Sequence, residues 1–565
     1  MKTLGIGHDL IISSAALVED GEVVAAVAEE RLNRQKQYKG FPTAAIKWCL
    51  ESAGTRLEDL DAVAVGWNPA RHIEHPNRRQ SNNARWKAEY LSAVPNMLFG
   101  IADGESGETV LQHVDGLGVP ITYYDHQLCH AANAFYLSPF DECAVFTADG
   151  LGERETTSWG TATRAGGLDI VGSVRMPNSL GMLYGSITQY LGYKPDSDEW
   201  KVMAMASYGR SDEYVDAVRA LVHTRPGSLE YQIDQRFFSY ALPEVWGGRF
   251  YTPDFVEVFG PPRDPDGEIT DRHQDIARAL QRVFEETMQH LLTELHALTG
   301  SSSVALSGGC MMNSVYNGRI TQTTPFEAAF VSSCPDDSGI AVGAALLAAA
   351  PVVKPGPRHN YWGPGYDTEI DETLARYKLR ADHLDDAAAT AARLLADGQL
   401  IGWFQGRMEF GQRALGNRSI LADPRPLSTK DLVNAAVKYR EAFRPFAPAI
   451  LAERVDDWFE TEHESAAPFM EKVLMFRDDV RDKVQAVVHV DGTGRLQTVE
   501  RDANPRFYDL IAAFEQLTGI PIVLNTSFNL NGEPIVCTPT DAIRTFMSCG
   551  LDALIMGDRL LTKAG

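Results

Sequence analysis

The sequence predicts an α/β protein with two domains. The chain has 565 residues, and because a single hydrophobic core rarely grows beyond about 250–300 residues, we expect more than one core. Hydrophobic residues make up 44% of the chain and charged residues 23%, which excludes a mainly disordered, fibrous or coiled-coil protein. Short apolar segments alternate with segments of helical periodicity, as expected for the α/β class.

The first half contains the same pattern twice, an apolar strand with glycine at its end or within it and then a hairpin. The strands are expected at 3–16 and 23–27 in the first copy, and at 144–148, 156–163 and 168–174 in the second. The first hairpin turns at Asp20-Gly21, and Asp-Gly is a strong hairpin signal. Two such units, with helices expected at 43–52 and 127–136, indicate a duplicated domain like those of the actin and sugar-kinase superfamily.

The first domain is expected to continue to residue 350, where the composition of the chain changes. An amphipathic segment at 272–298 predicts one or two helices, and 303–306 predicts a short buried strand. From residue 351 the chain becomes rich in proline, glycine and aromatic residues, which is typical of a crossover between domains. The expected division is a first domain at 1–350, a crossover at 351–384 and an α/β domain at 385–565.

The charge balance excludes some partners. The chain has 52 Lys and Arg against 76 Asp and Glu, a net charge of −24. So acidic a protein is poorly suited to the phosphate backbone of nucleic acids or to anionic membrane surfaces, so we expect neither as a partner. Arginines that cluster in such a chain therefore carry more information.

Three observations predict a cytoplasmic protein. The first ten residues contain no basic and apolar leader, so we expect no signal peptide. The longest apolar run, 340–353, is shorter than the roughly 20 residues of a membrane span. The seven cysteines form no CxxC pair, which is typical of reduced thiols in a cytosolic chain.

A first candidate site contains two histidines at helical spacing. Asp125 is a good helix N-cap, and His126 and His130 at i and i+4 share one helix face. Asp149, at the glycine end of a strand, and Asp336-Asp337 could complete a set of two imidazoles and carboxylates, which suits Fe(II), Mn(II) or Zn(II). The alternative is that the two histidines form only local hydrogen bonds.

A second candidate is the loop that starts at Ser307-Gly308-Gly309 and runs through Asn313. Glycines between a strand and a helix let backbone amides approach an anion or a nucleotide. An ordinary tight turn explains the same residues equally simply.

A third candidate is a series of cations set among glycine, proline and aromatic residues. Its segments are 406–419, 438–440 and 443–448. Guanidinium groups bind phosphate or carboxylate through two parallel hydrogen bonds. The alternative is that each arginine pairs with an acid such as Glu409 or Glu441. The strand and polar loop at 524–529 lie where α/β proteins commonly bind ligands, and the three candidates together predict an ATP-using enzyme.

Six blocks along the whole chain resemble the O-carbamoyltransferase family, whose members modify antibiotics, nodulation factors and other natural products. The blocks are Glu29-Glu30-Arg31, 179–184, Glu199 to Met203, 411–419, 443–448 and 524–529. The resemblance implies an N-terminal domain similar to the tRNA threonylcarbamoyl transferase and a C-terminal domain similar to threonylcarbamoyl-adenylate synthase. It also implies a reaction in which carbamoyl phosphate and ATP form carbamoyl adenylate, and the carbamoyl group then passes to a hydroxyl of a small natural product.

The resemblance assigns roles to residues of this chain. It implies Fe(II), or another divalent metal, at His126, His130, Asp149 and Asp337. It implies ATP, with Mg(II), against Ser307, Gly308, Gly309 and Asn313. It implies carbamoyl phosphate at Lys438, Arg444, Arg495 and Ser527, with Arg418 and Asn525 as neighbours. The residues expected to act in catalysis are His130, Arg418, Lys438 and Arg444.

The chain departs from the family at one place, and other functions stay open. Family members usually have a His-Asp pair where Ile11-Ile12 stand, whereas this chain has His8-Asp9 three residues earlier. The segments 67–107 and 211–264 differ most from the general pattern, and we expect contacts to the acceptor there. The alternatives are a sugar-kinase-like phosphotransferase, which would yield ADP, and an inactive nucleotide- or metal-binding protein.

Overall fold

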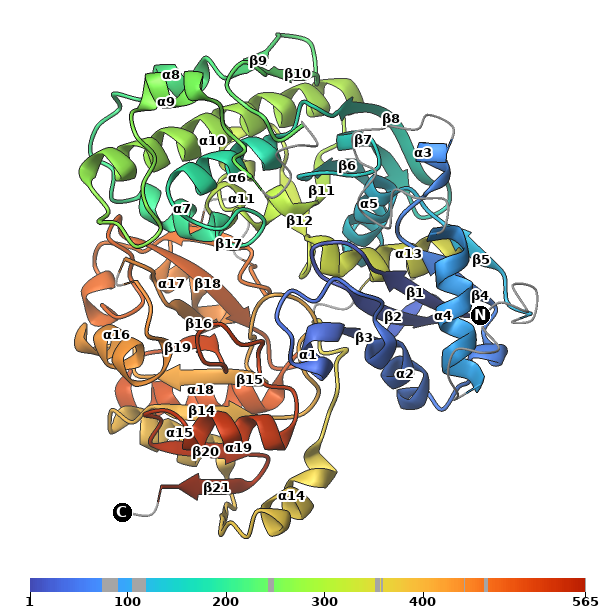
Figure 1. Cartoon of the computed structure of the whole chain (residues 1–565). Coiled ribbons are helices and arrows are strands. Elements are labelled where there is room, and N and C mark those ends of the chain that lie inside the picture. The colour runs from blue at the N-terminus through green and yellow to red at the C-terminus, as the bar shows by residue number, and fades with distance from the viewer. Residues whose placement is uncertain are drawn as a thin grey trace. The chain divides into compact units, whose positions relative to one another are not determined.

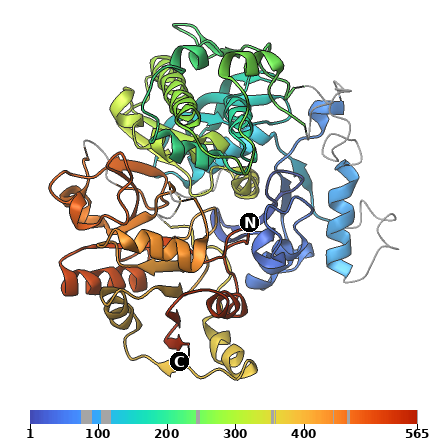
Figure 2. The ribbon, with the colours of Figure 1, turned by 60° about the vertical axis from the view of Figure 1, so that its left-hand side comes forward.

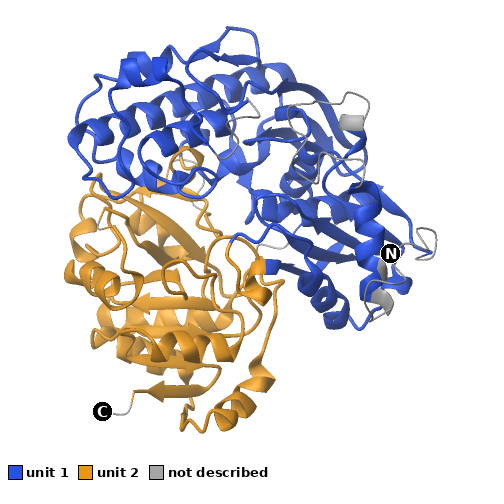
Figure 3. Cartoon of the chain, viewed as in Figure 1, with its two compact units in different colours: residues 1–29, 37–313, 319–356 blue, residues 30–36, 314–318, 357–565 orange. Residues whose placement is uncertain are grey.

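A computed structural model describes residues 1–73, 90–103, 118–241, 248–350, 356, 359–441, 443–461 and 466–563. The chain forms two compact units (Figure 3). Unit 1 consists of Met1–Glu29, Gln37–Asn313 and Arg319–Gly356, and unit 2 of Glu30–Lys36, Ser314–Gly318 and Pro357–Gly565. Each unit has its own sheets and core.

Unit 1 contains two five-stranded sheets with one topology. The first has the order β3-β2-β1-β4-β5 and the second the order β8-β7-β6-β11-β12. In each, the first three strands in sequence form an antiparallel meander, and two later strands join parallel to the first strand. The strands are β1 Lys2–Gly7, β2 Ser14–Glu19, β3 Glu22–Ala28, β4 Ala62–Val65, β5 Ile121–Tyr123, β6 Glu142–Ala148, β7 Glu155–Thr163, β8 Gly167–Arg175, β11 Ser303–Ser307 and β12 Ala328–Val331.

This repeated topology confirms the predicted duplication, with the strand arrangement expected for an actin- and sugar-kinase-like domain. Helix α5 (His126–Leu137) packs against β6 and β11, and α13 (Ile340–Ala349) packs against β1, β2, β4 and α5. The pair therefore links the two sheets (Figure 1). The sequence of α13 is apolar on every side, as a helix buried on all faces must be.

The first strand approaches α13 so closely that Gly5 has no room for a side chain. A Cβ atom at Gly5 would lie 1.9 Å from the carbonyl oxygen of Ala341. We expect Gly5→Ala to lower the free energy of unfolding by about 1–3 kcal/mol, the usual cost of overpacking, measured by urea unfolding. Gly100→Ala is the control, because a Cβ there meets nothing within 4 Å and should stabilise the protein slightly. Equal effects of the two changes would contradict this account.

Helices α6, α7 and α8 pack against α10 (Asp271–Thr299), the predicted amphipathic segment, which forms one continuous helix. Helices α7 and α8 pack along it (Figures 1 and 2). The remaining elements are α2 Thr43–Ser52, α3 Ala70–Ile73, α4 Tyr90–Asp103, α6 Leu180–Tyr190, α7 Glu199–Ala206, α8 Val215–Arg219, α9 Pro253–Phe259, α12 Ile320–Thr323 and the two-stranded ribbon β9 Val222–Thr224 with β10 Tyr231–Ile233.

Unit 2 is built on a nine-stranded mixed sheet, which confirms the α/β prediction for this half. Its order is β13-β21-β20-β14-β15-β19-β16-β18-β17. The strands are β13 Asp382–His383, β14 Ile401–Phe404, β15 Arg418–Ala422, β16 Ala447–Leu451, β17 Lys472–Met475, β18 Thr493–Val499, β19 Ile522–Ser527, β20 Ala553–Met556 and β21 Arg559–Thr562. Helices α15 (Ala387–Ala396) and α18 (Pro505–Thr518) pack on each other and on this sheet. The other helices are α14 Ile370–Arg376, α16 Ser428–Val433, α17 Val455–Trp458 and α19 Pro539–Met547.

Unit 2 also takes in residues from outside the second half. Helix α1 (Glu29–Asn33) falls, except for its first residue, in the segment Glu30–Lys36 of unit 2, and α11 (Ser314–Asn317) falls in the segment Ser314–Gly318. The expected crossover at 351–384 contains α14 and β13, and its residues 351–355 and 357–358 lie outside the described part. The boundaries at 350 and 385 stay predictions.

All seven cysteines lie among the described residues, and each is a free thiol. Six are buried and Cys549 is partly exposed. No helix in the described ranges is both long and apolar enough to span a membrane.

Candidate functional site

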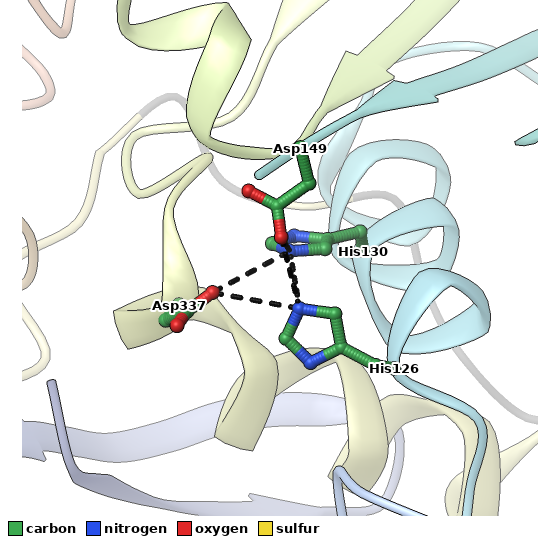
Figure 4. A group of neighbouring side chains, drawn as sticks. All are labelled: His126, His130, Asp149 and Asp337. Carbon is green, nitrogen blue, oxygen red and sulfur yellow. Dashed lines mark hydrogen bonds and ion pairs between the residues drawn. The ribbon is translucent and has the colours of Figure 1, made fainter. Parts of the chain in front are cut away.

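The predicted histidines and carboxylates meet in unit 1 (Figure 4). His126 and His130 project from one face of α5, Asp149 follows β6, and Asp337 begins the turn before α13. The Nε2 atom of His126 lies 3.1 Å from Oδ2 of Asp149 and 3.5 Å from Oδ1 of Asp337. The Nε2 atoms of the two histidines are 3.2 Å apart, and all four ligand atoms lie within 4.8 Å of one another.

In Asp149, Asp337 and His130, the polar side-chain atom that faces away from the centre of the cluster is held by a neighbouring group. The Gly309 N–H donates to Oδ1 of Asp149 at 2.9 Å, and the Ile11 N–H donates to Oδ2 of Asp337 at 3.0 Å. The Nδ1 atom of His130 lies 3.2 Å from the Ser307 hydroxyl. Each carboxylate therefore keeps one oxygen turned to the centre of the cluster, which is the arrangement of a monodentate ligand.

The cluster is buried and strongly coupled. Burial alone would lower the pKa of His126, but Asp149 and Asp337 outweigh it and raise that pKa to about 10. Burial would raise the pKa of Asp149, yet the two histidines hold it well below its usual range. Two buried carboxylates require compensating positive charge. Two imidazole nitrogens and two carboxylate oxygens at this spacing fit a divalent metal, with nitrogen and oxygen donors that suit Fe(II), Mn(II) or Zn(II).

A carboxylate that the sequence did not single out fixes the start of α5. Glu153 accepts the His126 backbone N–H at 3.0 Å with each of its oxygens and the Asn68 N–H at 2.7 Å. Asp125 is the N-cap residue of α5, as predicted, but its carboxylate bonds to Arg71 and Asn68 rather than to the helix N–H groups. Burial raises the pKa of Glu153 to about 7.

The predicted glycine loop lies against the same cluster. Gly308 has a φ of 99°, and a Cβ there would lie 2.1 Å from the Ala148 carbonyl oxygen, so only glycine fits. At the end of the loop, the Asn313 side-chain amide exchanges two hydrogen bonds with Gln281, at 2.9 and 3.0 Å. The loop thus connects the cluster to α10, and its contact with a nucleotide stays a prediction.

The predicted cations meet in unit 2 around the end of β19. The buried Lys438 ammonium donates to the Ser527 carbonyl at 2.5 Å and to the Ser527 hydroxyl at 3.2 Å. It also donates to Oδ1 of Asn529 at 3.0 Å. Burial and the charges of Arg440, Arg444 and Lys36 lower the pKa of Lys438 well below its usual value.

Arg495 is surrounded by positive charge. Its Nε atom is buried and has no hydrogen-bond partner among the described residues. Burial and the nearby Arg413, Arg440 and Arg444 lower the pKa of Arg495 well below its usual range. Burial and Arg444 likewise lower the pKa of Arg440 to about 9, although Glu441 opposes the shift. Cations this close together fit an anion with several charges, and the binding of such an anion here stays a prediction.

Comparisons with known proteins cover both halves of the chain. A family model described as the N-terminus of carbamoyltransferases matches residues 2–346, and one described as the C-terminus matches 392–563. The chain belongs to the carbamoyltransferase family. It is 37% identical to the nodulation protein NolNO of Sinorhizobium fredii over 98% of this chain and 79% of that protein. An uncharacterised protein of Synechocystis is 36% identical over 99% of this chain and 96% of that protein.

A further relative is named for its reaction. The 3'-hydroxymethylcephem-O-carbamoyltransferase of Amycolatopsis lactamdurans is 34% identical over 51% of this chain and 54% of that protein. The resemblance predicted from sequence blocks is confirmed, and this carbamoyltransferase is a transferase enzyme.

Arg418 does not join the cations around Arg495 through its side chain. The side chain is fully buried, and it donates to the carbonyls of Gln405 at 2.6 Å, Asn417 at 2.9 Å, Pro364 and Gly406 at 3.1 Å and Cys537 at 3.4 Å. Its guanidinium also lies 3.7 Å from the centroid of the Phe404 ring. In this carbamoyltransferase the Arg418 side chain therefore holds loops together through their carbonyl groups. Arg413, five residues earlier in the same motif, is instead one of the charges that lower the pKa of Arg495.

The alternative pairing with an acid holds for Arg444. Arg444 lies 3.2 Å from Glu441. Glu409 instead accepts the backbone N–H groups of Leu415 and Asn417, both at 2.7 Å. Asn525 donates to Gln497 at 2.8 Å and to the Ala414 carbonyl at 3.2 Å. Glu409 and Asn525 thus hold the loop that carries Arg413.

Ile11-Ile12, which stand where family members usually have a His-Asp pair, lie beside the cluster of histidines and aspartates. Ile11 contacts Asp337 through its backbone N–H, as described above. His8 is buried, its ring is stacked on Tyr90 with centroids 4.5 Å apart, and its Nδ1 lies 3.6 Å from Asp9. Parts of the two segments expected to contact the acceptor, 74–89, 104–107 and 242–247, lie outside the described residues, so that expectation stays a prediction.

Proposed function

We propose that this carbamoyltransferase uses carbamoyl phosphate and ATP to carbamoylate a hydroxyl group of a small molecule. The observation that carries the proposal is the cation cluster of unit 2, in which Arg495 has no acidic partner in the described structure. Carbamoyl phosphate and the triphosphate of ATP are both polyanions, and fixed cations can hold them in line for reaction.

The first half-reaction belongs in unit 2. Water cleaves carbamoyl phosphate into carbamate and inorganic phosphate, and a carbamate oxygen then attacks the α-phosphate of ATP, which forms carbamoyl adenylate and releases pyrophosphate. Lys438, Arg444, Arg495 and Ser527 bind carbamoyl phosphate, and Arg413 adds a further charge. Arg418 and Asn525 position this group through the loops they hold.

The second half-reaction belongs in unit 1. His126, His130, Asp149 and Asp337 would hold a divalent metal, for which the family resemblance implies Fe(II). Such a metal polarises a carbonyl or phosphate oxygen or lowers the pKa of a hydroxyl group. The loop from Ser307 to Asn313 binds the nucleotide portion of carbamoyl adenylate, and the acceptor hydroxyl replaces AMP. The relative that acts on a hydroxymethylcephem supports an acceptor of natural-product type.

Pyrophosphate release from ATP tests the first half-reaction. Purified protein is mixed anaerobically with ATP, magnesium and carbamoyl phosphate, and a burst of about one pyrophosphate per chain is expected even without an acceptor, because the adenylate can remain bound. The control omits carbamoyl phosphate. Steady formation of ADP instead would support the kinase-like alternative, and the absence of both products would contradict the proposed activation step.

A further inference from the structure

Nδ1 of His130 is the ring nitrogen that faces away from the cluster, and it lies next to the Ser307 hydroxyl group. The other neighbours of that hydroxyl indicate where its proton points. Ser307, fully buried at the end of β11, has its Oγ 3.2 Å from Nδ1 of His130. The same oxygen lies 3.2 Å from the Pro335 carbonyl oxygen and 3.5 Å from Nδ2 of Asn133. A serine hydroxyl has one proton to donate and two lone pairs that accept.

The partners of Ser307 decide where that proton points. The Pro335 carbonyl can only accept, so the hydroxyl proton is directed to it. Nδ2 of Asn133 is a donor, since it also lies 2.8 Å from the Cys334 carbonyl oxygen and 2.9 Å from the Ser332 hydroxyl. With its proton given to Pro335, the Ser307 oxygen is left to accept from His130.

We propose that Ser307 is a positioning residue that holds the His130 ring in the tautomer with its proton on Nδ1. In that tautomer the lone pair of Nε2 faces the centre of the cluster, where a metal ligand needs it. The inference rests on the proposed metal site and adds a residue to it. It also gives Ser307 a role separate from the nucleotide contact expected for its loop.

The second histidine provides an internal contrast. Nδ1 of His126 is buried and has no hydrogen-bond partner among the described residues. Of the two histidines, only His130 has a neighbouring side chain that selects its tautomer. The ring of His130 is therefore more firmly preorganised for metal binding than the ring of His126.

The surroundings keep this arrangement fixed. A Cβ at Gly339 would lie 2.5 Å from Nδ2 of Asn133, so the turn before α13 closes directly over that amide. The neighbouring Gly309 N–H holds Asp149. One loop thus orients both a histidine and a carboxylate of the cluster.

The test compares divalent-metal affinity in full-length variants, by competition of Zn(II) and Co(II) with a chromophoric chelator. Ser307→Ala is expected to weaken binding about 10–100-fold, the usual effect of losing a group that orients a ligand, and to change the ligand-field absorption of bound Co(II). Ser307→Thr keeps the hydroxyl and is expected to bind within about threefold of wild type. Ser332→Ala is the matched control, because Ser332 bonds to the same Asn133 but not to His130.

The outcomes separate this inference from the metal proposal. Failure of wild-type protein to bind either metal would overturn the metal site itself. Wild-type binding that Ser307→Ala leaves unchanged would overturn the role of Ser307 alone. Equal losses in Ser307→Ala and Ser332→Ala, or no rescue by threonine, would show that general packing matters rather than the hydroxyl. Thermal unfolding of each metal-free variant verifies that it is folded.

Discussion

Replacing Arg495 with methionine is expected to slow carbamoyl-phosphate-dependent pyrophosphate release about 100-fold or more without destabilising the free protein. The loss follows because a guanidinium that binds a buried anion contributes several kcal/mol to that contact. The stability follows from the positive charges of Arg413, Arg440 and Arg444 near Arg495, which repel its guanidinium. Methionine keeps the aliphatic stem but removes the repulsion, so the free energy of unfolding should stay equal or rise.

The measurement pairs single-turnover pyrophosphate release with urea unfolding of the same samples. Arg495→Lys is the control, since it retains the charge but loses the planar pair of donors. Its rate of pyrophosphate release should lie between the rates of the wild type and of Arg495→Met. The stability difference should shrink at high salt, because salt screens repulsion between charges. A variant that loses stability and activity together would instead make Arg495 a structural residue.

Much of this fold could be predicted because its signals are local. Asp20-Gly21 and the glycines near residue 166 specify the hairpins, and i, i+4 spacing placed His126 and His130 on one face of α5. That a turn at 337 reaches the same point could not follow from spacing, since it depends on a parallel sheet and on α13. The sequence left Asp336 and Asp337 as candidates, the resemblance selected Asp337, and the structure places Asp337 in the cluster.

Other contacts of the predicted residues could not be read from the sequence. Arg413 and Arg418 occupy one motif, and nothing in it tells which side chain turns to backbone carbonyls. Asp125 is a good N-cap by type, but Asn68 and Arg71, distant in sequence, take its carboxylate and leave the helix start to Glu153. In each case the deciding contact lies far along the chain, where only tertiary packing selects the partner.

Replacing Asp149 with asparagine should separate the two half-reactions. Asparagine can still accept the Gly309 N–H with its oxygen, but it places an uncharged amide where the inner carboxylate oxygen faced both histidines. The site then loses one of its two negative charges, and divalent-metal affinity should fall by at least about 100-fold, more than for a residue that only orients a ligand. The pyrophosphate burst, which depends on the cations of unit 2, should stay within about threefold of wild type.

Metal content after dialysis and the pyrophosphate burst are measured on the same preparation. Asp336→Asn is the matched control, because this carboxylate lies in the same turn as Asp337 but outside the ligand set, and it should keep both properties. Retention of metal by Asp149→Asn would remove Asp149 from the ligand set. Loss of the burst along with the metal would mean that activation also requires the cluster of unit 1, so the assignment of one half-reaction to each unit would fail.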